Sequence, residues 1–169
     1  LDNFSLRAAL AIPPAEIWKA HLAAKKALIG HVNSVVNVKM DVDHFTIGFA
    51  RRAAPYKRAA LLVSDTERLK RMVDATGPIQ IIYAGKAHPK DDTGKKIIER
   101  IYQAIEELRG AIRVCYLADY DLYLARLVTS GTDLWVNTPQ PPLEASGTSG
   151  MKAALNGSPS LSVLDGWWI

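Results

Sequence analysis

Five short apolar runs, separated by segments of helical character, constrain the fold of this chain more than any other feature of its sequence. The runs are expected to be strands at 46–50, 79–84, 112–117, 134–136 and 160–164. Continuously apolar strands, rather than alternating ones, are typical of a parallel sheet that helices cover on both faces. The sequence therefore predicts an α/β fold with a doubly wound, Rossmann-like parallel sheet.

The segments between these runs carry helical periodicity. Pro13 and Pro14 favour a helix start, because proline is tolerated in the first turn, and apolar residues recur at helical spacing from there to about residue 32. The clearest helix is predicted over 92–109, where an apolar stripe lies opposite a charged face. Further helices are predicted after Tyr56, from about Asp121 to Val128, and within 147–155.

The chain divides at about residue 45, where the first strand run begins. Residues 1–44 are predicted to form an N-terminal helix and a polar approach segment, and 45–169 a Rossmann-like domain. The chain does not begin with Met, and it ends on Trp167 and Trp168 with a single residue after them, too little to cover two bulky rings. We therefore expect both ends to be cuts in a longer polypeptide, with the domain truncated at its C-terminus.

The charge balance favours an anionic small molecule over nucleic acid. The chain has 21 Lys and Arg against 17 Asp and Glu, a formal net charge of +4. Its basic residues are spread out except in the cluster Arg51, Arg52, Lys57 and Arg58, whereas a nucleic-acid-binding domain usually gathers them on one face. No apolar stretch approaches the roughly 18 residues of a membrane helix, so neither nucleic acid nor a membrane is an expected partner.

The histidines and the cysteine do not point to a metal site or a disulfide. Cys115 is the single cysteine and lies in the apolar run 112–117, which predicts a buried core residue, excludes an internal disulfide and favours a reducing, cytosolic setting. His88 has no Cys or His partner at metal-ligand spacing, and the other three histidines are expected to be surface or packing residues. No metal site is predicted.

Doubly wound sheets bind ligands at the carboxyl ends of their strands, which directs attention to the loop that enters the helix predicted within 147–155. Its Gly-Thr-Ser-Gly stretch at 147–150 offers backbone N–H groups and hydroxyls to an anion, assisted by the helix dipole. The stretch is neither a Walker loop nor a dinucleotide-binding glycine motif. Lys152 follows just inside the helix, where an inward-pointing lysine beside an anion site could form a Schiff base. The alternative is a helix-capping loop with a solvated lysine.

A second set of candidates follows the first strand run. Arginine offers a fixed fork of donors to phosphate oxygens, and lysine adds a compact point charge. Arg51, Arg52 and Lys57 belong to a loop of four cations that repel one another unless an anion or a carboxylate sits among them. The position favours an anion site, while spacing alone also allows a solvated basic turn. Tyr120, after the third run, either stacks on a flat ring or packs.

These segments match one family in both order and spacing. Residues 144–157, Glu-Ala-Ser-Gly-Thr-Ser-Gly-Met-Lys-Ala-Ala-Leu-Asn-Gly, resemble the segment of α-glucan (glycogen, starch and maltodextrin) phosphorylases whose Lys carries pyridoxal phosphate. Arg52 with Tyr-Lys-Arg at 56–58 resembles the family's Lys-Arg-x-x-x-Tyr-Lys-Arg, and 84–87 matches its Ala-Gly-Lys-Ala. The similarity spans 46–166, and Pro-Gln-Pro-Pro at 139–142 resembles the shorter bacterial and archaeal branch.

The resemblance implies the C-terminal half of a two-domain GT-B glycosyltransferase fold, with the catalytic cleft between the domains. It implies transfer of a terminal glucosyl unit from an α-1,4-glucan to inorganic phosphate, giving α-glucose 1-phosphate, with the 5′-phosphate of pyridoxal phosphate as general acid/base. The expected partners are these substrates and the N-terminal domain of the same enzyme, in a cytoplasmic homo-oligomer without a phosphorylation switch. Because this chain carries half of the cleft, it is expected to be inactive alone.

Carried over residue by residue, the resemblance implies three roles. Lys152 would hold the cofactor covalently, with Gly147, Thr148, Ser149 and Arg51 around its phosphate and Tyr120 packed on its ring. Arg52 and Lys57 would bind the substrate phosphate and stabilise its charge at the transition state. Glu144 and Ser146, with Gly147, would hold the glucosyl hydroxyls.

The sequence departs from the phosphorylase pattern at two positions, and two other functions are compatible with parts of it. Arg51 stands where long-form members have Lys, and Asp121 follows Tyr120 where they have Arg. A nucleotide-sugar glucosyltransferase of the glycogen or starch synthase kind shares the fold, an Arg and a Lys five positions apart and a Glu-x-x-Gly loop, and Lys152 distinguishes the two classes. A non-catalytic anion- or glucan-binding module is compatible with the same residues.

Overall fold

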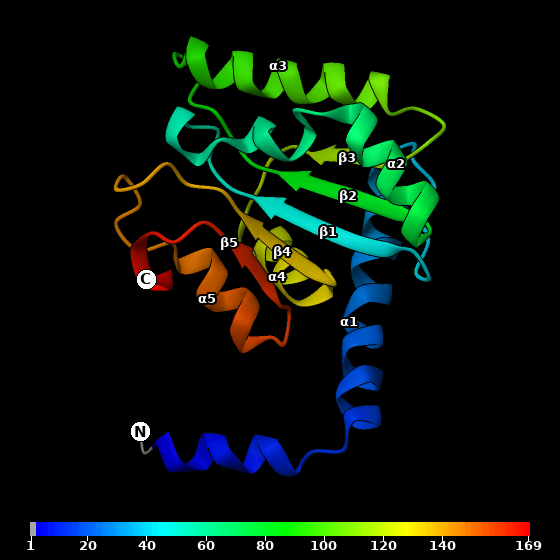
Figure 1. The fold of residues 1–169 in the computed structure, drawn as a ribbon, viewed down its shortest axis with the longest axis vertical. Coiled ribbons are helices and arrows are strands. Elements are labelled where there is room, and N and C mark those ends of the chain that lie inside the picture. The colour runs from blue at the N-terminus through cyan, green and yellow to red at the C-terminus, as the bar shows by residue number, and fades with distance from the viewer. Residues whose placement is uncertain (1–2) are drawn as a thin grey trace.

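A computed structural model describes residues 3–169 of the chain, and its five strands form one sheet (Figure 1). Every neighbouring pair of strands is parallel. The order across the sheet is β3-β2-β1-β4-β5. The predicted α/β class and Rossmann-like parallel sheet are therefore confirmed. The strands are β1 (Phe45–Ala50), β2 (Ile79–Ala84), β3 (Arg113–Leu117), β4 (Leu134–Asn137) and β5 (Ser160–Ser162).

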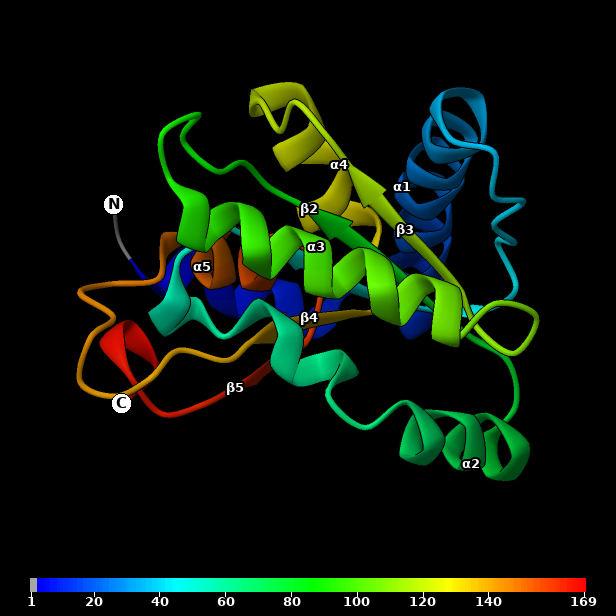
Figure 2. The same cartoon turned by 90° about the horizontal axis from the view of Figure 1, so that it is seen from above.

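Helices cover both faces of this sheet, and Figure 2 shows α3 crossing in front of it. One face carries α2 (Thr66–Thr76), α3 (Asp92–Glu107) and the short 3-10 helices η2 (Pro55–Lys57) and η3 (Ala59–Val63). The other face carries α1 (Pro14–Val35), α4 (Leu122–Gly131) and α5 (Thr148–Leu155). Two further 3-10 helices, η1 (Asn3–Ala11) and η4 (Gly166–Trp168), lie towards the two ends of the chain.

Side-chain alternation along the central strands supplies two separate cores. In β1, Ile47 and Phe49 join the core under α2 and α3, while Ala50 joins the core under α1 and α4. In β2, Ile81 belongs to the first core and Ile82 to the second. Because both faces are buried, these strands are apolar at nearly every position, which is the pattern that the sequence displays.

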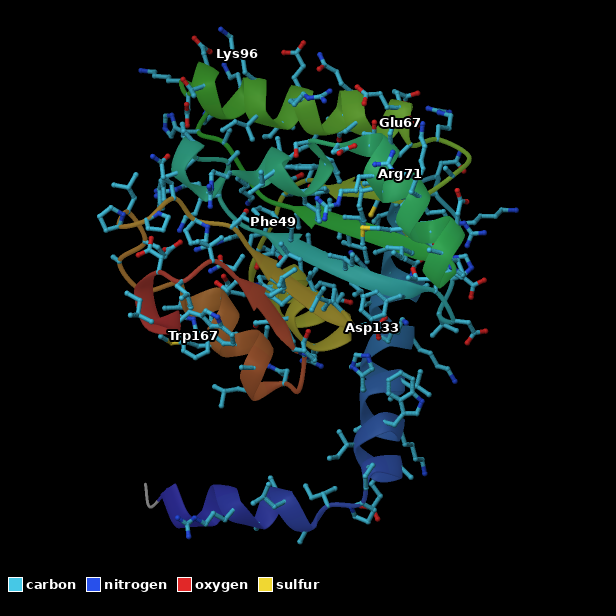
Figure 3. All side chains as sticks on the ribbon, viewed as in Figure 1. Phe49, Glu67, Arg71, Lys96, Asp133 and Trp167 are labelled. Atoms are coloured by element: carbon cyan, nitrogen blue, oxygen red, sulfur yellow. The ribbon has the colours of Figure 1, made fainter. Side chains whose placement is uncertain are left out.

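A buried ion cluster ties α1 to the amino edge of the sheet. Asp133, just before β4, accepts hydrogen bonds from Lys25 Nζ at 2.6 Å and from the backbone N of Thr46 at 2.7 Å. Its other oxygen lies 2.7 Å from His21 Nε2. Lys25 also donates to the carbonyl of His44 at 2.8 Å. Figure 3 shows Asp133 beside α1, so the cluster joins segments that are 108 positions apart in the chain.

Several predicted boundaries differ from the structure. No single helix follows Tyr56, because Arg58 adopts the left-handed backbone conformation with φ 48° and separates η2 from η3 before α2 begins. The first helix continues to Val35 and the fourth to Gly131, while β5 ends at Ser162. The last three differences lie at element ends, where local periodicity is least informative.

Cys115 is a core residue, as predicted. It is 3% exposed, and burial raises the pKa of its thiol to about 12. Within residues 3–169, no helix is long and apolar enough to cross a membrane. The same part of the chain contains no group of three His, Cys, Asp or Glu side chains placed to hold a metal ion.

Candidate active site at the carboxyl edge of the sheet

A cavity of about 640 Å³ opens at the carboxyl edge of the sheet, between the loops after β1, β3 and β4 and the start of α5. Its volume lies in the range typical of small-molecule sites. The structure brings every site residue predicted from the sequence to the wall of this one cavity. They are Arg51, Arg52, Lys57, Tyr120, Glu144, Ser146, Gly147, Thr148, Ser149 and Lys152.

The centre of the cavity wall is an ion triad of two cations and one carboxylate. Arg51 Nη2 donates to Glu144 Oε2 at 2.6 Å, and Lys57 Nζ lies 2.7 Å from Oε1 and 2.5 Å from Oε2. The three side chains are 6–8% exposed. The second terminal nitrogen of Arg51 donates to Asn137 Oδ1 at the end of β4. The sequence predicted that either a bound anion or a carboxylate lies among these cations. In the structure, the carboxylate of Glu144 takes this place and neutralises them in part.

The triad sets the charge of Glu144. Burial on its own raises the pKa of this carboxyl group, but hydrogen bonds from Lys57 and the charge of Arg51 outweigh burial. The pKa of Glu144 therefore lies below its ordinary value, and the group is ionised at neutral pH.

Lys57 is held by its neighbour as well as by Glu144. Its Nζ lies 4.4 Å from the centre of the Tyr56 ring, within the range of a cation–π contact. A hydrogen bond with Lys57, and a second with Arg52, lower the pKa of the Tyr56 hydroxyl. Arg52 itself is exposed at the cavity, so it is the cation of this loop most open to an incoming anion.

The segment after β5 holds the loop that carries Glu144 through two hydrogen bonds, which together we call the clasp. Asp165 Oδ2 accepts the backbone N–H of Glu144 at 2.9 Å, and Trp167 N donates to the Ser146 carbonyl at 2.9 Å. A Cβ added to Gly150 would lie 3.2 Å from the indole nitrogen of Trp167. Figure 3 shows Trp167 beside α5. Trp167 is therefore half-buried against residues that precede it in the chain, namely this loop and the start of α5.

The first turn of α5 is built to meet an anion. Gly147 precedes it with φ 83°, a left-handed conformation that favours glycine, and no side chain caps the helix. Ser149 Oγ is buried yet has no hydrogen-bond partner within residues 3–169. Lys152, one turn further, is exposed on the cavity wall, and no described carboxylate forms an ion pair with it. Unsatisfied donors at a helix N-terminus are a favourable place for a phosphate group.

These residues fit pyridoxal phosphate, the cofactor implied by the sequence resemblance. An unpaired hydroxyl, a helix start without a side-chain cap and Arg51 suit its phosphate, and the side chain of Lys152 on the same wall suits its aldehyde. Tyr120 offers a ring on the same wall; burial raises the pKa of its hydroxyl, while the charge of Arg51 acts in the opposite direction.

Some neighbours of the site were not predicted from the sequence. Asn137 holds Arg51 and donates to Ser162 Oγ at 3.0 Å, and Asp165 holds the backbone of Glu144. Asn137 could have been found from the sequence, since it is a polar residue directly after the apolar run 134–136. Gly85 lies outside the cavity lining; a Cβ there would come within 2.2 Å of the Arg51 carbonyl, so its role is close backbone packing.

Comparison with known proteins agrees with this geometry. A family model described as carbohydrate phosphorylase matches residues 13–169. A glycogen phosphorylase of Aquifex aeolicus is 45% identical, covering 94% of this chain and 25% of its own length. A maltodextrin phosphorylase of Thermococcus litoralis is 42% identical, covering 94% of this chain and 21% of its own.

A third relative shows the same relation over a shorter stretch. A glycogen phosphorylase of Mycobacterium tuberculosis is 47% identical, covering 76% of this chain and 15% of its own length. The chain therefore spans about a quarter or less of the length of these relatives. Because the family model matches nearly all residues of this chain, the chain belongs to the carbohydrate phosphorylase family.

Proposed function

We propose that this chain is part of an α-glucan phosphorylase, an enzyme that transfers a terminal α-1,4-linked glucosyl unit to inorganic phosphate and gives α-D-glucose 1-phosphate. The observation that carries the proposal is the meeting of Lys152, the unsatisfied Ser149 hydroxyl and the cations after β1 on one cavity wall. Family membership supports the same reaction, and the matched relatives include enzymes named glycogen phosphorylase and maltodextrin phosphorylase.

Pyridoxal 5′-phosphate is the proposed cofactor. Lys152 would hold it covalently, with Gly147, Thr148, Ser149 and Arg51 at its phosphate and Tyr120 against its ring. When bound, the cofactor supplies a phosphate group that exchanges a proton with the substrate phosphate. The chain's own contribution is to fix that group: the dipole of α5 and the Arg51 guanidinium favour its negative charge, and the half-buried Tyr120 limits access of water to it.

The substrates are assigned to the remaining residues of the wall. Arg52 and Lys57 bind the substrate phosphate and stabilise negative charge that develops on it in the transition state. Glu144 and Ser146, together with the backbone at Gly147, accept and donate hydrogen bonds to the glucosyl hydroxyls. Ionised Glu144 can only accept, so it selects hydroxyl donors.

The rest of the glucosyl site is assigned to the N-terminal domain of the same enzyme, in a cytoplasmic homo-oligomer. The chain by itself is then expected to release no glucose 1-phosphate from maltodextrin and phosphate. Its release by this chain would show that 169 residues hold a complete site.

Parallel titrations test the proposal against the alternative hypothesis that the chain belongs to a nucleotide-sugar glucosyltransferase. Calorimetry of the chain with pyridoxal phosphate and with UDP-glucose is expected to show saturable binding of pyridoxal phosphate alone. Lys152→Ala should weaken that binding, whereas Lys86→Ala should not, because Lys86 is exposed and outside the cavity lining. Tight binding of UDP-glucose with none of pyridoxal phosphate would replace the proposal with a nucleotide-sugar glucosyltransferase.

A further inference from the structure

We propose that Glu144 occupies the anion site of this cavity while no phosphate group is bound, and that an arriving phosphate displaces it from Arg51 and Lys57. The exchange frees the carboxylate for sugar hydroxyls, so the glucosyl site is completed only when the phosphate site is filled. This inference rests on the proposed function for the second role of Glu144. The first role rests on the ion triad alone.

The triad has the geometry of an anion site with a carboxylate in it. Both oxygens of Glu144 contact Lys57, and one of them also accepts from Arg51. Phosphate oxygens are bound by the same fork of arginine donors and by the same lysine point charge. All three side chains are more than nine-tenths buried, so without a carboxylate or a phosphate these cations would be desolvated and unpaired, which is strongly unfavourable.

Two anions cannot share these cations without cost. The terminal nitrogens of Arg51 are engaged by Asn137 and Glu144, and the ammonium of Lys57 is engaged by Glu144. A phosphate that contacts either cation places its oxygens within a few ångströms of the Glu144 carboxylate, and like charges at that separation repel strongly away from bulk water. A phosphate carries more negative charge and more acceptor oxygens than the carboxylate, so the phosphate replaces it.

The backbone on both sides of the Glu144 side chain is fixed by hydrogen bonds. The backbone N–H of Glu144 is fixed by Asp165, and the neighbouring carbonyl of Ser146 is fixed by Trp167 N. The exchange that we propose therefore moves the side chain of Glu144 and leaves this backbone in place. Because Ser146 lies on the same cavity wall, the released carboxylate remains beside the residues assigned to the sugar. Binding of phosphate and binding of sugar are then linked with the same factor in both directions.

Inorganic phosphate titrated into the chain and into Glu144→Gln tests the exchange. Glutamine keeps the shape of the side chain and removes the competing charge, so phosphate should bind the variant more tightly, by on the order of 5- to 150-fold. Glu107→Gln is the matched control: Glu107 pairs with Arg100 on the exposed surface, and the change removes the same charge. The control should bind phosphate as the wild type does.

Unfolding measurements keep the test decisive if Glu144→Gln folds poorly. Rising phosphate concentration should raise the unfolding temperature of Glu144→Gln by more than it raises that of the wild type, since ligand binding to the folded state stabilises it. Equal or weaker phosphate affinity in Glu144→Gln, together with no larger thermal shift, would overturn the exchange. A carboxylate with a purely structural role would give this outcome, because its removal would not free a phosphate site.

Loading the chain with pyridoxal phosphate separates the two possible phosphate groups. If the substrate phosphate performs the exchange, the affinity difference between wild type and Glu144→Gln persists in the loaded chain. If the phosphate of the cofactor performs it, the difference is present in the unloaded chain and disappears on loading. Absence of cofactor on Lys152 would overturn the proposed function and leave the inorganic phosphate comparison intact.

Discussion

Replacement of Asp133 should destabilise the fold strongly, although this residue lies at the opposite edge of the sheet from the cavity. Its carboxylate is the anion that faces Lys25 at 2.6 Å and His21 at 2.7 Å, with side chains only 4–12% exposed. Removal of one partner of a buried ion pair typically costs about 3–5 kcal/mol.

Two substitutions of Asp133 separate the cost of the lost ion pair from the cost of the lost hydrogen bond to Thr46. Asp133→Asn retains an oxygen for the backbone N–H of Thr46 but leaves the charge of Lys25 unpaired, so a loss of about 3 kcal/mol in the free energy of unfolding is expected. Asp133→Ala also removes the acceptor for Thr46, which adds about 1–3 kcal/mol. Lys25→Met combined with Asp133→Asn should lose less than Asp133→Asn alone, because the unpaired charge is gone.

Urea unfolding, monitored by tryptophan fluorescence, measures these differences in the free energy of unfolding. Trp135 is fully buried two positions from Asp133, so its emission reports loss of this part of the core. Glu106→Gln is the control: it breaks the exposed pair of Glu106 and Arg109 and should leave the unfolding midpoint unchanged. A loss of less than about 1 kcal/mol in the free energy of unfolding of Asp133→Ala would refute the reasoning, since an ion pair on the exposed surface contributes that little.

Two further predictions concern the candidate site. Because the pKa of Glu144 is lower in the folded chain than in the unfolded one, its contribution to stability is complete above about pH 4.3, the ordinary value for Glu, and is lost as the pH falls through the lowered value. Glu144→Gln should therefore flatten the acid limb of a plot of unfolding free energy against pH, and an unchanged limb would contradict the triad. Gly166→Ala should cost more than about 1 kcal/mol and shift tryptophan emission, because φ is 62° there and the added Cβ would lie 2.5 Å from the Ser146 carbonyl; wild-type stability and emission would contradict the clasp.

The class of fold could be predicted from the sequence because its signal is local. Apolar residues fill β1 and β2 at almost every position, and this pattern requires burial of both faces. The 3-10 turns after β1 could not be predicted, because the left-handed backbone of Arg58 is imposed by tertiary bonds from its side chain to the carbonyls of Thr138 and Pro139.

The site could be predicted in its membership but not in its internal contacts. The carboxyl-end rule selects the right loops, and each candidate residue reaches the cavity. That Glu144 neutralises Arg51 depends on a contact across 93 positions, and local sequence carries no record of such a pairing. The same holds for Asp165, whose hydrogen bond to the backbone of Glu144 exists only once β5 lies beside β4.

The position of the cofactor label tests the central proposal most directly. The chain is incubated with pyridoxal phosphate, reduced with borohydride and digested, and the modified lysines are mapped by mass spectrometry in the wild type and in Lys152→Ala. The account predicts a label confined to the peptide that contains Lys152 and absent from the variant. A label spread over exposed lysines such as Lys95 and Lys26, equal in both proteins, would contradict it.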